Sequence, residues 1–119
     1  MKKTLVLGAS LKPERYSNLA VNRLLDKGIE TVAFGLREGK IRDVDIKTDF
    51  EDFQDIQTIT LYIGKKHQSE YVDKILSLQP ERVIFNPGTE NPELYEILKK
   101  NNIAVEVACT LVLLGTGQY

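Results

Sequence analysis

The residues of this chain best suited to chemistry lie in TLVLGASLKPERYSNLA, residues 4–20. An apolar run ends at Gly8, and Lys12 and Arg15 follow in a charged loop before a helical pattern begins. A turn between a strand and the amino end of a helix offers N–H groups and a positive dipole to an anion. A guanidinium adds a two-pronged donor and a lysine adds a point charge. The further side-chain donors are Ser10, Ser17 and Asn18. The stretch predicts a phosphate site; the alternative is an ordinary charged loop.

The kind of phosphate compound is narrowed by motifs that are missing. After Gly8 the chain reads Ala-Ser-Leu-Lys-Pro, so the dinucleotide fingerprint G-x-G-x-x-G is absent. The acidic residue that would hold a ribose diol is also missing, because Phe34, Gly35, Leu36 and Arg37 occupy its place. Arg37 would suit an extra phosphate on the ribose, as in NADP or coenzyme A, or it is a solvated loop charge. The Walker pattern is absent as well, so NTP hydrolysis has no support.

Composition excludes several other classes of protein. The chain has 119 residues, which suits one domain over residues 1–119, and a formal net charge of −1, which gives no sign of nucleic-acid binding. One Cys and one His exclude an internal disulfide and argue against a Cys/His zinc site. The apolar start is too short for a signal peptide, and no run is long enough to span a bilayer. We expect a cytoplasmic protein without membrane or metal partners.

Short apolar runs alternate with amphipathic segments along the chain. The expected strands cover residues 4–8, 30–35, 57–63, 82–86 and 103–107. The expected helices cover residues 17–27, with Ser17 as N-cap, residues 68–78, and a segment that starts at Pro92 after the N-cap Asn91. A short strand at 44–47 and a helical turn opened by Asp49 are expected between the second and third main strands. The apolar tail CTLVLLG is expected to pack on the sheet.

This alternation predicts a Rossmann-like α/β fold: a five-stranded parallel sheet in the order 3-2-1-4-5, with helices on both faces. Ligands of such sheets bind beyond the carboxyl ends of the strands, at the point where the strand order reverses. We expect that point between the first and fourth strands. The segments that this rule selects are 8–18, 34–38, 63–67, 86–91 and 108–110.

The chain resembles the small single-domain CoA-binding proteins, which are related to the CoA-binding domain of the succinyl-CoA ligase α subunit. The family's first strand and loop run roughly V-x-G-A-S-x-x-P-x-R, and VLGASLKPER is similar to this pattern. A helix like SNLAVNRLLDKG follows, and RVIFNPGTENPEL has the form of a later strand, glycine and Asn-Glu pair before a helix. The later segment NNIAVEVAC resembles the family pattern G-I-x-V-V-x-x-x-C. The resemblance covers nearly the whole chain.

The resemblance implies a set of residues around bound coenzyme A or acyl-CoA. The pyrophosphate would be held by Gly8, Ala9, Ser10, Arg15 and Ser17 or Asn18, while the loop after the second strand would face the adenosine. The remaining wall would consist of Gly64, Lys65, Pro87, Gly88 and Asn91. Two departures affect the adenosine side: Gly35-Leu36 stands where the family usually has Asn-Pro, and IGKKH stands where it often has Arg-Pro or Lys-Pro.

Catalytic groups are scarce in this sequence. Cys109 ends the fifth expected strand and would form a mixed disulfide with the CoA thiol, or it is a buried small apolar residue. We expect His67 to be an exposed loop residue at a ligand rim. Glu90 and Glu106 do not form a convincing acid–base pair. The segment 49–55 contains a run of acidic residues, which we expect to form a solvent-exposed surface: Asp49, Glu51, Asp52 and Asp55.

Three functions therefore remain open. The first is a module, monomeric or homodimeric, that binds a CoA-type small molecule without turnover of its own. The second is an NAD(P)-dependent or ligase-type enzyme, which only the predicted sheet supports. The third is a regulatory subunit whose cleft no longer binds a ligand.

Overall fold

The structure, a computed structural model, describes residues 3–119. Its strands are β1 (Lys3–Leu7), β2 (Glu30–Phe34), β3 (Gly39–Ile41), β4 (Val44–Lys47), β5 (Ile56–Leu61), β6 (Arg82–Phe85) and β7 (Ala104–Val107). Its helices are α1 (Tyr16–Asp26), α2 (Lys65–Gln68), the 3₁₀ turn η1 (Ser69–Tyr71), α3 (Val72–Leu78), α4 (Pro92–Lys100) and α5 (Thr110–Gly115). Within these residues no helix is long and apolar enough to cross a bilayer.

The strands form one 7-stranded sheet in the order β3-β4-β2-β1-β5-β6-β7. All neighbours pair in parallel except β3 and β4, which form an antiparallel hairpin at one edge. The Rossmann-like α/β class is confirmed, but the predicted five-stranded parallel order is wrong. The short strand β4 takes the place beside β2, so β5 pairs with β1 instead of lying at the edge. With β4 as the third strand and β3 left aside, the order is that of doubly wound dinucleotide folds.

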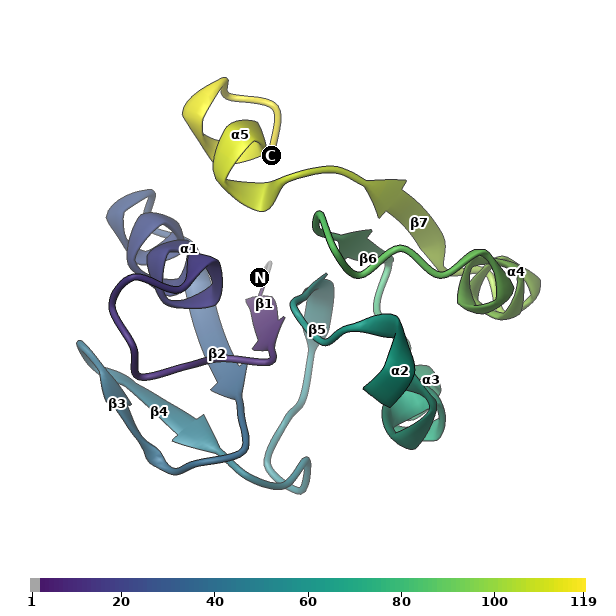
Figure 1. Cartoon of the computed structure of the whole chain (residues 1–119), viewed down its shortest axis with the longest axis horizontal. Coiled ribbons are helices and arrows are strands. Elements are labelled where there is room, and N and C mark those ends of the chain that lie inside the picture. Colours follow the sequence, from purple (N-terminus) through teal and green to yellow (C-terminus); the bar gives the residue numbers. More distant parts are fainter. Residues whose placement is uncertain (1–2) are drawn as a thin grey trace.

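Helices cover both faces of the sheet (Figure 1): α1 and α5 lie on one side, and α2, α3 and α4 on the other. The hydrophobic core therefore consists of two clusters, one on each face of the sheet. One apolar cluster, which includes Leu5, Ile59 and Phe85, lies under α3 and α4. The other, which includes Val6 and Leu24, lies under α1 and α5. Successive residues of a strand point to opposite faces, which explains why Leu5 and Val6 belong to different clusters.

Two local predictions differ from the structure. Helix α1 starts one residue earlier than expected, its N-cap is Arg15, and Ser17 lies inside the helix. No helix follows Asp49; residues 48–52 form bends and a turn. In contrast, Asn91 is the N-cap of α4, where its side chain accepts from the Leu94 amide, and Pro92 takes the first helical position. This last prediction rested on two local signals that act together, which explains its success.

The ends of β1 and β2 are held unusually close together. The amides of Gly8 and Ala9 both donate to the Phe34 carbonyl, at 2.9 and 2.8 Å. A Cβ at Gly35 would lie only 2.5 Å from the Ala9 carbonyl oxygen and 2.9 Å from the Ile46 side chain. Only glycine leaves room for the turn after β1 to lie against the end of β2. This contact sets the direction in which the chain leaves the sheet toward α1.

We expect Gly35→Ala to lower the free energy of unfolding by about 2 kcal/mol, because the added methyl overpacks a fixed backbone contact. Urea unfolding measures the loss. Gly115→Ala is the matched control, since nothing lies within 4 Å of a Cβ there. A Gly35→Ala variant as stable as the Gly115→Ala variant would contradict the close approach.

Candidate functional site

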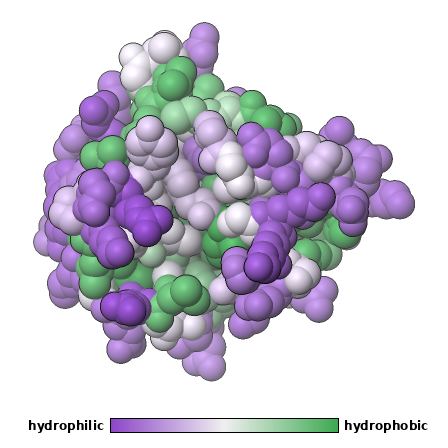
Figure 2. Space-filling model, in the orientation of Figure 1, coloured by the Kyte–Doolittle hydropathy of each residue, from purple (hydrophilic) through white to green (hydrophobic). Residues whose placement is uncertain are grey.

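A cleft of about 930 Å³ opens at the carboxyl ends of β2, β1 and β5. It lies where the strand order reverses, between β1 and β5 rather than between the first and fourth predicted strands. The loops after β1 and β2 and the segment after β5 line it: Gly8, Ala9, Ser10, Leu11, Lys12, Arg15, Tyr16, Ser17, Phe34, Leu36, Arg37, Tyr62, Ile63, Gly64, His67, Glu70 and Tyr71. Figure 2 looks onto this end, where hydrophilic residues border a paler floor.

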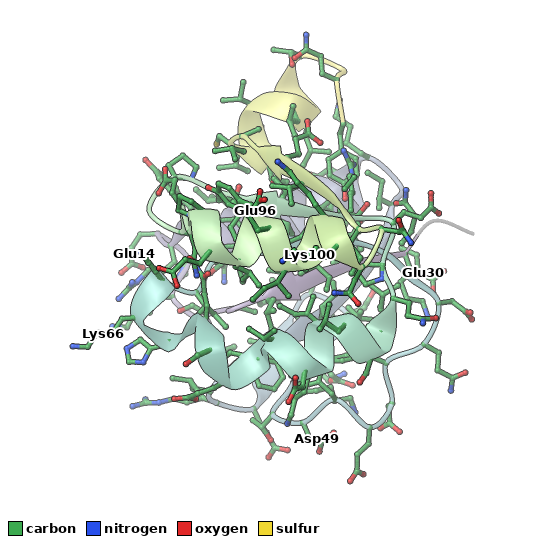
Figure 3. All side chains as sticks on the ribbon, turned by 90° about the vertical axis from the view of Figure 1, so that its right-hand side faces the viewer. Glu14, Glu30, Asp49, Lys66, Glu96 and Lys100 are labelled. Carbon is green, nitrogen blue, oxygen red and sulfur yellow. The ribbon has the colours of Figure 1, made fainter. Side chains whose placement is uncertain are left out.

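The cleft lies at one end of the molecule. Figure 3 shows Glu14, from the loop after β1, and Lys66, from α2, at this end, and Glu30 at the opposite end, where β2 begins. Side chains from the loops after β1 and β5 therefore reach the same edge of the sheet. The parallel topology causes this, because the carboxyl ends of parallel strands meet at one edge.

The amino end of α1 faces this cleft without a cap. Its N-cap Arg15 makes no side-chain cap hydrogen bond. Within residues 3–119, no backbone hydrogen bond outside the regular elements uses the amides of Tyr16, Ser17 or Asn18 as donors. The opposite arrangement holds in α4, where Asn91 supplies the cap. Uncapped amides and the positive end of the helix dipole form a binding site for an anion.

Cationic side chains surround this helix end. Lys12, Arg15 and Arg37 all line the cleft, where the only carboxylate among the lining residues is Glu70. The ion pairs found within residues 3–119 involve none of the three cations. Their charges are thus left for a ligand. The cleft lining is net positive although the chain as a whole has a formal charge of −1.

The predicted donors of the first loop divide into two groups. The amides of Gly8 and Ala9 are used by the Phe34 carbonyl, so these residues shape the turn. Asn18 is buried, and its side-chain Nδ2 donates to the Ser10 carbonyl at 2.8 Å. The Ser10 hydroxyl accepts from the Lys12 amide at 3.2 Å. The groups that remain open toward the cleft are the α1 amides and the side chains of Lys12 and Arg15.

The other wall of the cleft follows β5. It contains Gly64 and His67, both singled out in the sequence, and Glu70 and Tyr71, which were not. The Tyr71 ring meets Phe34 edge-on, with ring centroids 5.4 Å apart. Burial, with a smaller contribution from the Glu70 charge, raises the pKa of Tyr71. This wall is therefore mixed in character, with an aromatic floor and polar groups at the rim.

Six of the predicted site residues are not among the residues that line the cleft: Asn18, Lys65, Pro87, Gly88, Asn91 and Cys109. Asn91 and Cys109 are N-caps, of α4 and α5 respectively. The two glutamates have structural partners: Glu90 accepts from the Gly88 amide at 2.9 Å, and Glu106 pairs with Arg82 at 2.8 Å. Within residues 3–119 no three His, Cys, Asp or Glu side chains form a group that could hold a metal ion.

Tyr62 borders the cleft and was not foreseen. Its buried hydroxyl makes no hydrogen bond within residues 3–119. Burial of this hydroxyl raises the pKa of Tyr62 from 10.0 to about 12. Side chains alternate between the two faces along β5, and this alternation continues to Tyr62, so its ring lies under α1. No sequence pattern predicts that its hydroxyl is buried.

We expect Tyr62→Phe to be at least as stable as the wild type at pH 7, because it removes a buried polar group that has no partner. Above pH 10 the unfolded tyrosine loses its proton first, so the wild type loses stability as the pH rises toward 12. The variant should lose less over this range. Urea unfolding at several pH values measures both effects; a strongly destabilised variant at pH 7 would show that the hydroxyl has a partner.

Solved structures share this architecture over nearly the whole chain. A crystal structure of a protein described as uncharacterized superposes with a TM-score of 0.96 at 44% identity, covering 100% of this chain and 98% of that one. A hypothetical protein from Pyrococcus horikoshii OT3 gives 0.83 at 25% identity, covering 93% and 80%. A Thermus thermophilus protein, cell-free ID.343, gives 0.87 at 20% identity, covering 99% and 90%, and shows the fold alone.

Among proteins with curated descriptions, none matches this chain significantly. Residues 2–115 do match one protein family, the CoA binding domain family. The match covers the cleft, the uncapped helix α1 and both helical layers. It agrees with the resemblance that the opening motif and the later Asn-Pro-Gly-Thr-Glu-Asn segment indicated. The chain therefore belongs to the family of CoA-binding domains.

Proposed function

We propose that this protein binds coenzyme A or an acyl-CoA in the cleft beside α1, and that it acts as a binding module without turnover of its own. The observation that carries this proposal is the uncapped amino end of α1, bordered by Lys12, Arg15 and Arg37, which have no acidic partners within residues 3–119. A diphosphate provides the negative charge and the acceptors that these groups lack. Membership of the CoA-binding family supports the same ligand.

The cleft fits a ligand of this size and chemistry. Its volume of about 930 Å³ lies at the upper end of the usual range for small-molecule sites, which suits a large nucleotide derivative. The diphosphate would lie at the α1 amides with Arg15 and Lys12. Arg37, at the end of β2, would meet the 3′-phosphate of the ribose. The mixed wall with Ile63 and Tyr71 would accompany the pantetheine arm.

Catalysis has little support in this site. The lining contains one imidazole, His67, and one carboxylate, Glu70, on neighbouring turns of α2 and η1. An NAD-dependent enzyme would require the ribose-binding acid that Leu36 and Arg37 replace. NADP still shares the extra phosphate with CoA, so the binding experiments include it as a competing ligand.

We expect CoA at 100 times its Kd to stabilise the wild type by about 2.7 kcal/mol, seen as a rise in Tm. Arg15→Ala should weaken CoA binding about 10- to 100-fold, because it removes a charge-assisted hydrogen bond. Isothermal titration calorimetry measures the affinity. Arg23→Ala, in the last turn of the same helix, is the matched control. Equal affinities of the two variants, or a response to NADP but not to CoA, would refute the assignment.

A second prediction concerns Arg37. The wild type should bind CoA about tenfold more tightly than dephospho-CoA, since the 3′-phosphate supplies a charge-assisted contact. Arg37→Ala should bind the two ligands equally, with little change for dephospho-CoA. Titrating the wild type and Arg37→Ala with CoA and with dephospho-CoA gives the coupling energy between Arg37 and the 3′-phosphate directly. A preference for CoA that persists in Arg37→Ala would place the 3′-phosphate elsewhere.

A further inference from the structure

Of the loops after β5 and β6, only the loop after β5 lines the cleft. The first, with Ile63 and Gly64, lines it, whereas Pro87, Gly88 and Asn91 in the second do not. The structure contains a physical link between the two loops.

That link is the side chain of Gln68, the last residue of α2. It is only 1% exposed. Its amide group donates to the Ile63 carbonyl at 2.8 Å and to the Thr89 carbonyl at 2.8 Å. Its carbonyl oxygen accepts from the Asn91 amide at 2.9 Å. Both amide protons are used, so the side chain has a single orientation in which both loops are satisfied.

The second loop is itself fixed to the sheet. The Thr89 hydroxyl and amide both bond to the Asn86 carbonyl, at 2.7 and 3.0 Å. Asn86 is buried, and its side chain donates to the Leu61 carbonyl at 3.0 Å and accepts from the Thr110 amide at 2.8 Å. Gln68 therefore connects the cleft wall to a rigid buried network. Buried polar networks of this kind rigidify their surroundings when every group is paired.

We infer that Gln68 and Asn91 are positioning residues for the ligand: together they hold the wall of Ile63 and Gly64 in the shape that the ligand contacts. This inference rests on the proposed function. Asn91 acts through Gln68, and Gln68 acts through the Ile63 carbonyl, so neither needs to touch the ligand. The loop after β6 then influences affinity by fixing the position of its neighbour.

The test separates this role from the structural role of Asn91. Asn91→Ser keeps a good N-cap for α4 but is too short to reach Gln68. Asn91→Asp is a second variant that keeps the length and the cap, and it replaces the N–H donor with a charged oxygen that cannot donate to the Gln68 carbonyl oxygen. Asn101→Ser is the matched control, because its amide bonds to the Ile97 carbonyl at the other end of α4, at 2.8 Å.

We expect Asn91→Ser and Asn91→Asp to weaken CoA binding about tenfold relative to Asn101→Ser, a size typical of coupling through packed networks. Calorimetry measures the affinity. Amide hydrogen exchange of residues 62–68 in the ligand-free protein should be faster in both Asn91 variants and unchanged in Asn101→Ser. Affinities equal to that of Asn101→Ser would overturn the inference, whatever happens to Tm. A wild type that does not bind CoA would refute the proposed function, and the exchange rates would still decide whether Asn91 fixes the wall.

Discussion

The Phe34 carbonyl, which accepts from the amides of both Gly8 and Ala9, is the contact on which the site depends. It folds the turn after β1 back against the end of β2, and Gly35 provides the space for it. The chain must then travel through an open loop before α1 begins. As a result the first amides of α1 face the cleft instead of the turn.

This arrangement concentrates positive charge where the strand order reverses. Some basic residues elsewhere form ion pairs, such as Arg42 with Asp26 and Arg82 with Glu106. Lys12, Arg15 and Arg37 form no ion pair within residues 3–119. A helix end and unpaired cations in one place cost stability, because the charges repel one another. Such a cost is typical of a site that is completed by an anion.

The sequence allowed good prediction wherever the signal was local. The strand and helix alternation, the α4 start at Asn91 and Pro92, and the place of Arg15 beside a cleft all follow from short patterns. Strand order was mispredicted because it depends on which segment lies beside β2, and the short strand β4 carries no signal for that choice. Tyr62, Glu70 and Gln68 were missed because their roles depend on side-chain direction and on carbonyl groups of distant loops. No residue type or spacing records such contacts.

The contacts of Tyr119 have a consequence for the rates of folding and unfolding. The Tyr119 hydroxyl bonds to that of Thr4, and the Arg82 guanidinium lies 4.5 Å from the centre of the Tyr119 ring. Contacts between residues so far apart in sequence close a long loop, which is entropically expensive until the intervening strands are assembled. Interactions formed late in this way slow unfolding more than they speed folding. The contacts of Tyr119 with Thr4 and Arg82 therefore lengthen the lifetime of the native state. The folding rate depends instead on the pairing of the central parallel strands.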